Sequence, residues 1–230
     1  MQRFKKRHPN VSKRIPQKVN KAAMTFTAQK HAQWLEALLA FIDDRNENPN
    51  AQGLLLDPRR IFNADETGFA FMGVTGRLGA VLAERGSKYV CQETHGTKEQ
   101  FTVMYCGNAE STMLPPFIVV PATSPKNENK EPPVGWIDID KWPEAQAWAT
   151  SRGWMTSAAF IQFLHFMDQC ISTLPEFADV QRPILLVMDG HGSHISGPAA
   201  RFAKTKNIIL WLLPANATAV SKEKIFFFIS

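Results

Sequence analysis

The segment Ile184-Leu185-Leu186-Val187-Met188 constrains the fold of this chain more than any other feature. Five bulky apolar residues in a row lack the alternation of a half-exposed strand, so they predict a strand that is buried on both faces. Asp189 and Gly190 follow this run directly. A carboxylate in that position is held rigidly at the rim of a sheet.

A second aspartate stands at the end of another apolar stretch. The segment Arg60–Asp65 is short and strand-like, and it ends on Asp65. Two rigid carboxylates from different strands are the minimum that can share a divalent metal ion, and oxygen ligands suit Mg²⁺ or Mn²⁺. The alternative is that Asp65 and Asp189 only cap turns, because Asp is a common turn residue.

The composition is that of a globular protein, with 44% apolar and 20% charged residues. A length of 230 residues allows one good core with appendages.

Cys91, Cys106 and Cys170 stand far apart with no CxxC pair, which predicts reduced thiols in a cytosolic or nuclear setting. No stretch approaches about 18 consecutive apolar residues, so no membrane partner is expected. The basic, polar N-terminus has no apolar core of a secretory signal.

Positive charge is concentrated at the N-terminus. Residues 1–35 hold nine basic residues and no acid, whereas the remainder is mildly acidic. A basic arm on a near-neutral domain is typical of binding to a phosphate backbone, and the segment 3–8 also resembles a nuclear import patch. A solvated tail without a partner is the alternative. The candidate DNA-binding residues are Arg3, Lys5, Lys6, Arg7, Lys13 and Arg14.

Periodicity predicts the order of the main elements. Thr27 is the expected N-cap of one helix, and Thr156 or Ser157 caps a second that ends near Pro175. A third helix is expected from about Pro198 to Lys206. Strands are expected at 60–65, 88–91, 101–106, 116–121, 184–188 and 208–213. Strands followed by strand–helix–strand units predict an α/β domain with a mixed sheet.

Four tryptophans lie in the region from the end of the loop at 121–136 to the start of the second expected helix. This region is expected to be partly helical. Aromatic faces can stack on bases, but Trp at this density is more often packing. The residues are Trp136, Trp142, Trp148 and Trp154.

Several motifs in a fixed order give the chain a family resemblance. It resembles the DDE endonuclease domain of pogo- and jerky-type transposases, part of the RNase H-like superfamily. The resemblance covers roughly residues 56–220. The motifs are Ile61–Phe69, Ala83–Lys88, Gly96–Val103, Leu114-Pro115-Pro116, Gly153–Thr156, Asp189–Ser196 and Leu213-Pro214. Residues 3–9 also resemble the tail of the helix-turn-helix module that precedes this domain in the family.

The resemblance implies metal-assisted phosphodiester chemistry on DNA in the nucleus. Three carboxylates of the family hold two divalent ions, Mg²⁺ or Mn²⁺, and Asp65 and Asp189 align with the first two. His191 and His194 are interpreted as site-shaping residues. Zinc binding by these histidines is a weaker alternative, because no cysteine or further histidine stands at matching spacing.

The third acid is where the chain departs from the family pattern. In the family, Leu-Pro leads to a Gln-Pro-Leu-Asp-like motif, and here the expected aspartate position falls near Ile225. Glu223 is the nearest acid, but two lysines flank it and no motif surrounds it. Glu223 is therefore a doubtful third ligand.

The resulting domain prediction has four parts. These are a basic helix-turn-helix tail (1–25), a linker helix and loop (26–55), a DDE endonuclease-like domain (56–220) and a divergent end (221–230). The favoured function is nucleic-acid binding with impaired catalysis. An active endonuclease that uses Glu223 or a partner's acid, and a relic without function, are the alternatives. DNA and further copies of the same chain are the candidate partners.

Overall fold

The computed structural model describes residue 7 and residues 27–44, 50–70, 100–132, 141–194 and 196–214. The expected strand at 88–91, the turn at 83–88 and Glu223 lie outside the described residues, as does the basic arm apart from Arg7. The domain boundaries at 25 and 220 also fall outside them.

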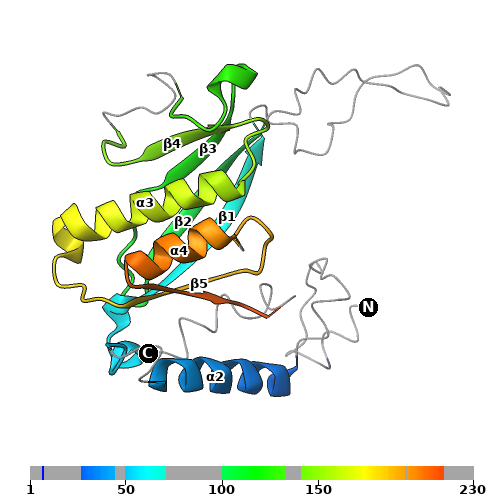
Figure 1. The fold of residues 1–230 in the computed structure, drawn as a ribbon. Helices are drawn as coiled ribbons and strands as arrows, with labels where there is room; N and C mark the ends of the chain where they lie inside the picture. The colour runs from blue at the N-terminus through cyan, green and yellow to red at the C-terminus, as the bar shows by residue number, and fades with distance from the viewer. Residues whose placement is uncertain are drawn as a thin grey trace.

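A six-stranded mixed sheet forms the centre of the domain (Figure 1). The strand order is β4-β3-β2-β1-β5-β6, in which β2 is antiparallel to β1 and β3, and the remaining neighbours are parallel. The strands are β1 (Ile61–Ala70), β2 (Gln100–Asn108), β3 (Phe117–Pro121), β4 (Gln146–Thr150), β5 (Ile184–Met188) and β6 (Ile208–Leu212). This arrangement, with flanking helices, is the RNase H-like α/β fold that the sequence led us to expect.

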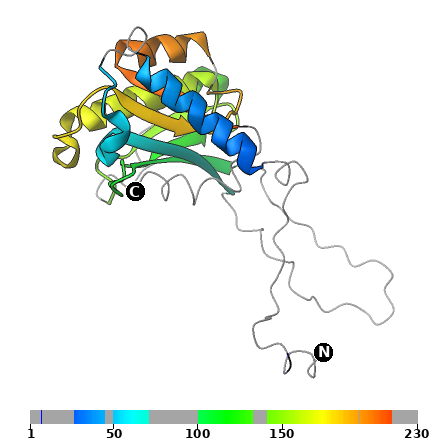
Figure 2. The ribbon, with the colours of Figure 1, turned by 90° about the horizontal axis from the view of Figure 1, so that it is seen from below.

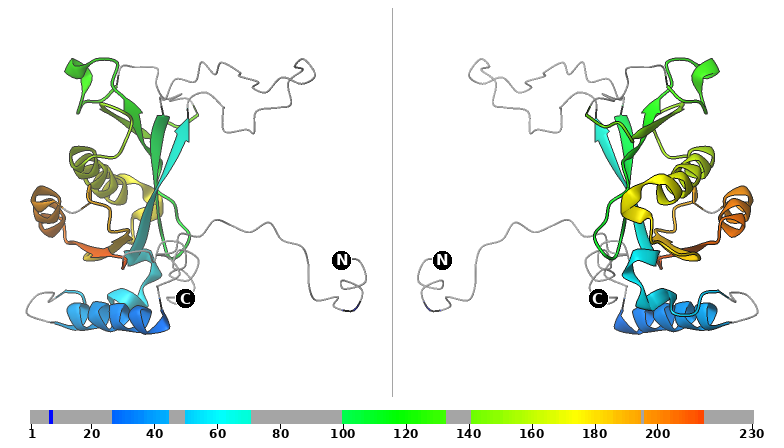
Figure 3. Two further views of the ribbon diagram at one scale, coloured as in Figure 1. Left: turned by 90° about the vertical axis from the view of Figure 1, so that its right-hand side faces the viewer. Right: turned by 90° about the vertical axis from the view of Figure 1, so that its left-hand side faces the viewer.

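In the part of the chain that the structure describes, three helices flank the sheet: α2 (Ala28–Asp43), α3 (Ser157–Thr173) and α4 (Gly197–Thr205). Thr27, Thr156 and Ser196 cap their N-termini, because each side-chain oxygen accepts a hydrogen bond from the backbone three residues later. Figure 3 shows α3 and α4 on the same side of the sheet. Short 3₁₀ turns lie at η2 (Leu54–Leu56), η3 (Pro58–Arg60), η4 (Pro125–Asn127) and η5 (Pro175–Phe177).

Strand β5 separates two hydrophobic cores. Its residues are all buried, as the unbroken apolar run predicts. Ile184, Leu186 and Met188 belong to the core beneath α3 and α4, whereas Leu185 and Val187 belong to the core beneath α2. Side chains alternate between the two faces of a strand, so a strand covered on both faces must be apolar throughout.

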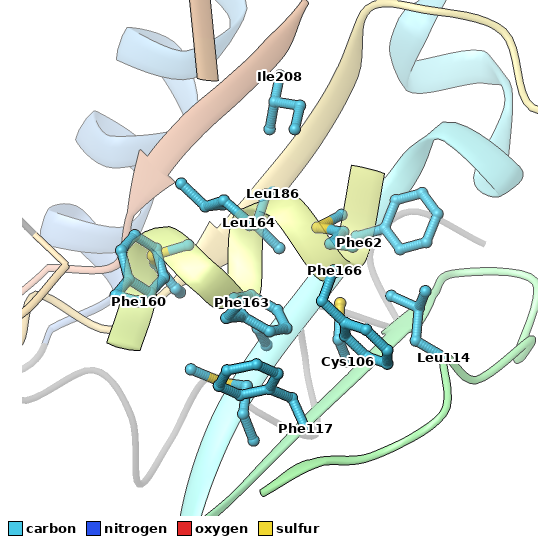
Figure 4. Close-up of a cluster of buried hydrophobic side chains, with 14 of the residues drawn as sticks. Phe62, Cys106, Leu114, Phe117, Phe160, Phe163, Leu164, Phe166, Leu186 and Ile208 are labelled. Atoms are coloured by element: carbon cyan, nitrogen blue, oxygen red, sulfur yellow. The ribbon is translucent and has the colours of Figure 1, made fainter. Parts of the chain in front are cut away.

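The larger core is built mainly from aromatic side chains. Figure 4 shows Phe160, Phe163 and Phe166 of α3 meeting Phe62 and Phe117 of the sheet. The rings of Phe117 and Phe163 meet edge to face, with their centroids 5.9 Å apart. The apolar face of α3 thus packs across β1 and β3.

Helix α2 covers the opposite face near β5 and β6, and Figure 2 shows its full length from below. Leu38 and Ile42 are buried against Leu185 and Ile209. Trp34 adds a polar anchor, because its ring Nε1 donates a hydrogen bond of 2.8 Å to the carbonyl of Leu212.

Two sequence predictions differ from the structure. Strand β1 continues through Asp65 to Ala70, because residues 62–70 pair one by one with β2, so Asp65 lies within the strand rather than at its end. The Trp-containing region includes β4, which was expected to be partly helical. Trp148 and its neighbours form this strand because they pair in parallel with β3.

Cys106 and Cys170 are buried free thiols. Burial raises the pKa of both thiols, that of Cys170 to about 12. Among the described residues, no helix has the length and apolar character that crossing a membrane requires.

Candidate metal centre between strands β1 and β5

The pairing of β1 with β5 places the two candidate aspartates at the same level. The parallel register runs from Ile61 with Leu185 to Asn63 with Val187. Asp65 and Asp189 each stand two residues beyond the last pair. The side-chain amide of Asn63 reinforces this end of the ladder, because it donates a hydrogen bond of 3.1 Å to the carbonyl of Val187.

Asp65 is half-buried on β1 and lies directly opposite Tyr105 of β2. Alternation along the strand places its side chain on the face that carries Asn63 and Ile61. Ile61 belongs to the core beneath α2, so Asp65 is on the α2 side of the sheet, beyond that core.

Asp189 follows β5 directly, and its carboxylate has defined partners. Oδ1 accepts a hydrogen bond of 3.2 Å from the backbone N–H of His191 and lies 3.1 Å from Nδ1 of His194. The hydrogen bond to His194 is the main reason that the pKa of Asp189 is lowered, and it outweighs the opposing effect of partial burial. The side chain is 37% exposed, so an ionised carboxylate is accessible at this edge.

His194 is the most buried member of the site, with 3% of its side chain exposed. Its ring packs against Phe160 of α3 at 4.7 Å between centroids. Nδ1 lies 3.1 Å from the backbone oxygen of Asp189, and Nε2 lies 2.8 Å from Oε1 of Glu66. Burial alone lowers the pKa of His194, but the hydrogen bonds to Asp189 and Glu66 together raise it to about 9.

Glu66 is the functional candidate that sequence reasoning missed. It follows Asp65, so alternation turns it to the opposite face of β1, where Phe62 and Ala64 enter the core beneath α3. A carboxylate on the same face of the strand as two core residues needs a hydrogen-bond partner when it is buried. The sequence shows that Glu66 shares a strand face with Phe62 and Ala64, but it does not show that the partner of Glu66 is His194.

Glu66, His191 and His194 also form a cluster of metal-ligating side chains, with one ligand atom from each within 4.8 Å of the others. A set of two histidines and one carboxylate is typical of zinc. Both ring nitrogens of His194 are already within hydrogen-bond distance of acceptors, and Nδ1 of His191 lies 2.7 Å from Oγ of Ser193. The arrangement therefore fits a hydrogen-bonded network better than an open metal site.

That Asp65 and Asp189 share a divalent cation stays a prediction. Both residues offer carboxylate oxygens, which Mg²⁺ and Mn²⁺ prefer, and the lowered pKa of Asp189 keeps it in the ionised form that a ligand requires. Glu223 and five of the six basic candidates lie outside the described residues, and Arg7 is exposed.

The strand order and the flanking helices define the class of this protein as RNase H-like α/β. A family model described as DDE superfamily endonuclease matches residues 98–222, which is more than half of the chain, and the chain belongs to this family. The match includes Asp189, His191 and His194 but begins after Asp65. No curated protein sequence matches the chain.

Solved structures of the Mos1 transposase are similar to this chain. A paired-end complex with the left transposon end has 12% identity and a TM-score of 0.48 over 99% of this chain and 55% of that one. The catalytic domain of Mos1 mariner transposase has 13% identity and a TM-score of 0.46, over 94% and 73%. A paired-end complex with Mn has 12% identity and a TM-score of 0.45, over 98% and 57%. The chain thus spans about half the length of the Mos1 chains in those complexes.

Proposed function

We propose that this chain is a transposon-derived, DDE endonuclease-like protein that binds DNA and a divalent cation but cleaves DNA poorly. The observation that supports the proposal is the parallel register of β1 and β5, whose last pair, Asn63 and Val187, stands two residues before Asp65 and Asp189. Membership of the DDE superfamily endonuclease family supports the same chemistry.

In this proposal the carboxylates of Asp65 and Asp189 hold Mg²⁺ or Mn²⁺. A divalent ion in such a site polarises a phosphoryl oxygen and lowers the pKa of bound water. The chain's own contribution is to keep the two carboxylates ionised and fixed in position. The sheet fixes Asp65, and the hydrogen bonds from His191 and His194 fix Asp189.

Impaired cleavage follows from the third ligand. The family resemblance implies a third carboxylate after Leu213-Pro214, and residues 215–230 contain a single acid, Glu223, between two lysines. Two carboxylates can hold one Mg²⁺ whose octahedral coordination water completes, but a site for two divalent ions needs further ligands. Loss of one electrostatic group from an active site typically costs about 3 kcal/mol of transition-state stabilisation, or a factor of about 100 in rate.

The basic N-terminal arm is the proposed DNA-binding element and the proposed nuclear import signal. Nine basic residues without an acid in residues 1–35 supply the charge. Each phosphate contact releases counterions, so affinity for DNA should fall steeply as salt rises. Deletion of residues 1–25 should weaken retention on DNA and flatten its dependence on salt. Unchanged affinity after this deletion would place the DNA contacts elsewhere.

Nicking of supercoiled plasmid in Mn²⁺ tests the proposed function directly. The expected result is DNA retention in a filter-binding assay with nicking close to background. Rapid nicking that Asp189→Asn abolishes would show an intact active site and overturn the proposed impairment. Absence of both retention and nicking, for a folded protein, would overturn the proposed DNA binding.

A further inference from the structure

We propose that His194 is a positioning residue for the carboxylate of Asp189, and that Glu66 fixes His194 in that role. The inference rests on the proposed function, because it concerns one of the two proposed cation ligands. It adds Glu66 to the residues of the proposal above, and it uses neither Glu66 nor His194 as a ligand.

Both nitrogens of the His194 ring have hydrogen-bond partners. Nδ1 faces the backbone oxygen and Oδ1 of Asp189, each at 3.1 Å, and Nε2 faces Oε1 of Glu66 at 2.8 Å. A carbonyl and an ionised carboxylate only accept hydrogen bonds, so both ring nitrogens donate. The ring is thus held at both ends.

His194 is much more deeply buried than the carboxylate that it contacts. His194 has 3% of its side chain exposed and packs against Phe160, whereas Asp189 has 37% exposed. A rigid, buried donor therefore holds a carboxylate that stands just past the end of β5, outside the strand ladder. Such fixed hydrogen bonds orient a metal ligand before the ion arrives.

The two carboxylate oxygens of Asp189 differ in their hydrogen-bond partners. The hydrogen bonds from His191 and His194 both fall on Oδ1. These contacts leave Oδ2 as the oxygen to face a cation. The turn 189–194 thus holds its own carboxylate in one orientation.

Glu66 links His194 to strand β1. Asp65 and Glu66 are consecutive on β1, so their side chains point to opposite faces of the sheet. One dipeptide therefore supplies a proposed cation ligand on one face and the anchor for His194 on the other. The anchor ties the turn after β5 to β1 at the level of the two aspartates.

Titration of Mn²⁺ into the full chain, followed by electron paramagnetic resonance, tests the proposal. Glu66→Ala is expected to weaken Mn²⁺ binding by about 10-fold, whereas Glu66→Gln, which keeps an acceptor for Nε2, should stay within about 3-fold of the wild type. Glu36→Ala removes an exposed carboxylate of equal charge from α2 and is the control, with unchanged affinity expected. Melting curves of all variants report folding separately.

The ring N–H protons of His194 give a second readout that needs no metal. Proton NMR of the metal-free chain should show hydrogen-bonded ring N–H signals that are lost in Glu66→Ala and retained in Glu66→Gln. This readout separates the two proposals. If Asp65→Asn and Asp189→Asn bind Mn²⁺ like the wild type while these signals behave as expected, the proposed function fails and the positioning contact stands.

Three results would overturn the positioning role. One is an Mn²⁺ affinity of Glu66→Ala that matches the wild type despite a lower melting temperature. Another is retention of the ring N–H signals in that variant. The third is a histidine-ligated Co²⁺ spectrum of untagged protein that disappears in His194→Gln, because His194 would then be a ligand itself.

Discussion

The side-chain amide of Asn63 donates a hydrogen bond of 3.1 Å to the backbone oxygen of Val187, and each of these residues stands two positions before a candidate aspartate. This bond joins β1 to β5 at the last pair of their register. The two strands are therefore tied together two residues before each of the proposed cation ligands.

Removal of this tie should destabilise the domain modestly. Asn63→Ala is expected to lower the free energy of unfolding by about 1 kcal/mol, the usual net value of a hydrogen bond. Asn127→Ala, which removes an exposed side-chain bond to Thr123, is the control and should change it by less than about 0.5 kcal/mol. Urea unfolding measures both, and equal effects would contradict a special role for Asn63.

His194 should make the stability of the metal-free chain depend on pH. The folded-state pKa of about 9 lies above the ordinary value of 6.5. The folded state therefore holds this proton more tightly, and the resulting stabilisation is fully present below pH 6.5 and is lost as pH rises through 9.

Urea midpoints measured in the presence of a chelator should fall across this interval. The decline should be much smaller in His194→Gln, which cannot take up the proton. His165→Gln, an exposed histidine of α3, should retain the wild-type decline. A slope that is the same in wild type and His194→Gln would assign the pH dependence to other groups.

The packing of β5 predicts a large difference between two chemically identical substitutions. Leu186 is 0% exposed in the core beneath α3, whereas Leu56 is 88% exposed. Leu186→Ala should cost about 2–5 kcal/mol of unfolding free energy through lost burial and a cavity. Leu56→Ala should stay within about 0.5 kcal/mol, as surface substitutions do. A small cost for Leu186→Ala would contradict the doubly covered position of β5.

Burial also predicts the reactivity of the thiols. Cys106 and Cys170 are buried, and burial raises the pKa of each, so little thiolate is available for reaction. In a Cys91→Ser background, a disulfide reagent such as DTNB should modify neither thiol in the native protein and both in denaturant. Rapid modification under native conditions would contradict the packing of α3 on the sheet.

The sequence predicted those parts of the fold that depend on local signals. The caps at Thr27 and Thr156 and the buried strand 184–188 were confirmed, because capping oxygens and apolar runs act locally. The length of β1 was underestimated, because polar residues 65–68 are held as strand by pairing with β2. Strand β4 was missed for the same reason, since its pairing with β3 decides its conformation.

The candidate site was predictable only in part. Asp65 and Asp189 were visible as acids that follow apolar segments, and the last pair of β1 and β5 stands two residues before each of them. Glu66 was missed because its partner, His194, is 128 residues away, and no sequence spacing encodes that contact. Whether Asp65 and Asp189 act together stays a prediction.

A double-mutant cycle of Mn²⁺ binding tests that claim most directly. The affinity is measured for the wild type, Asp65→Asn, Asp189→Asn and the double variant. If both carboxylates hold the same ion, each single variant loses most of the affinity and the double variant loses little more, so the effects are strongly non-additive. Additive effects, or single variants that bind Mn²⁺ like the wild type, would contradict a shared cation between β1 and β5.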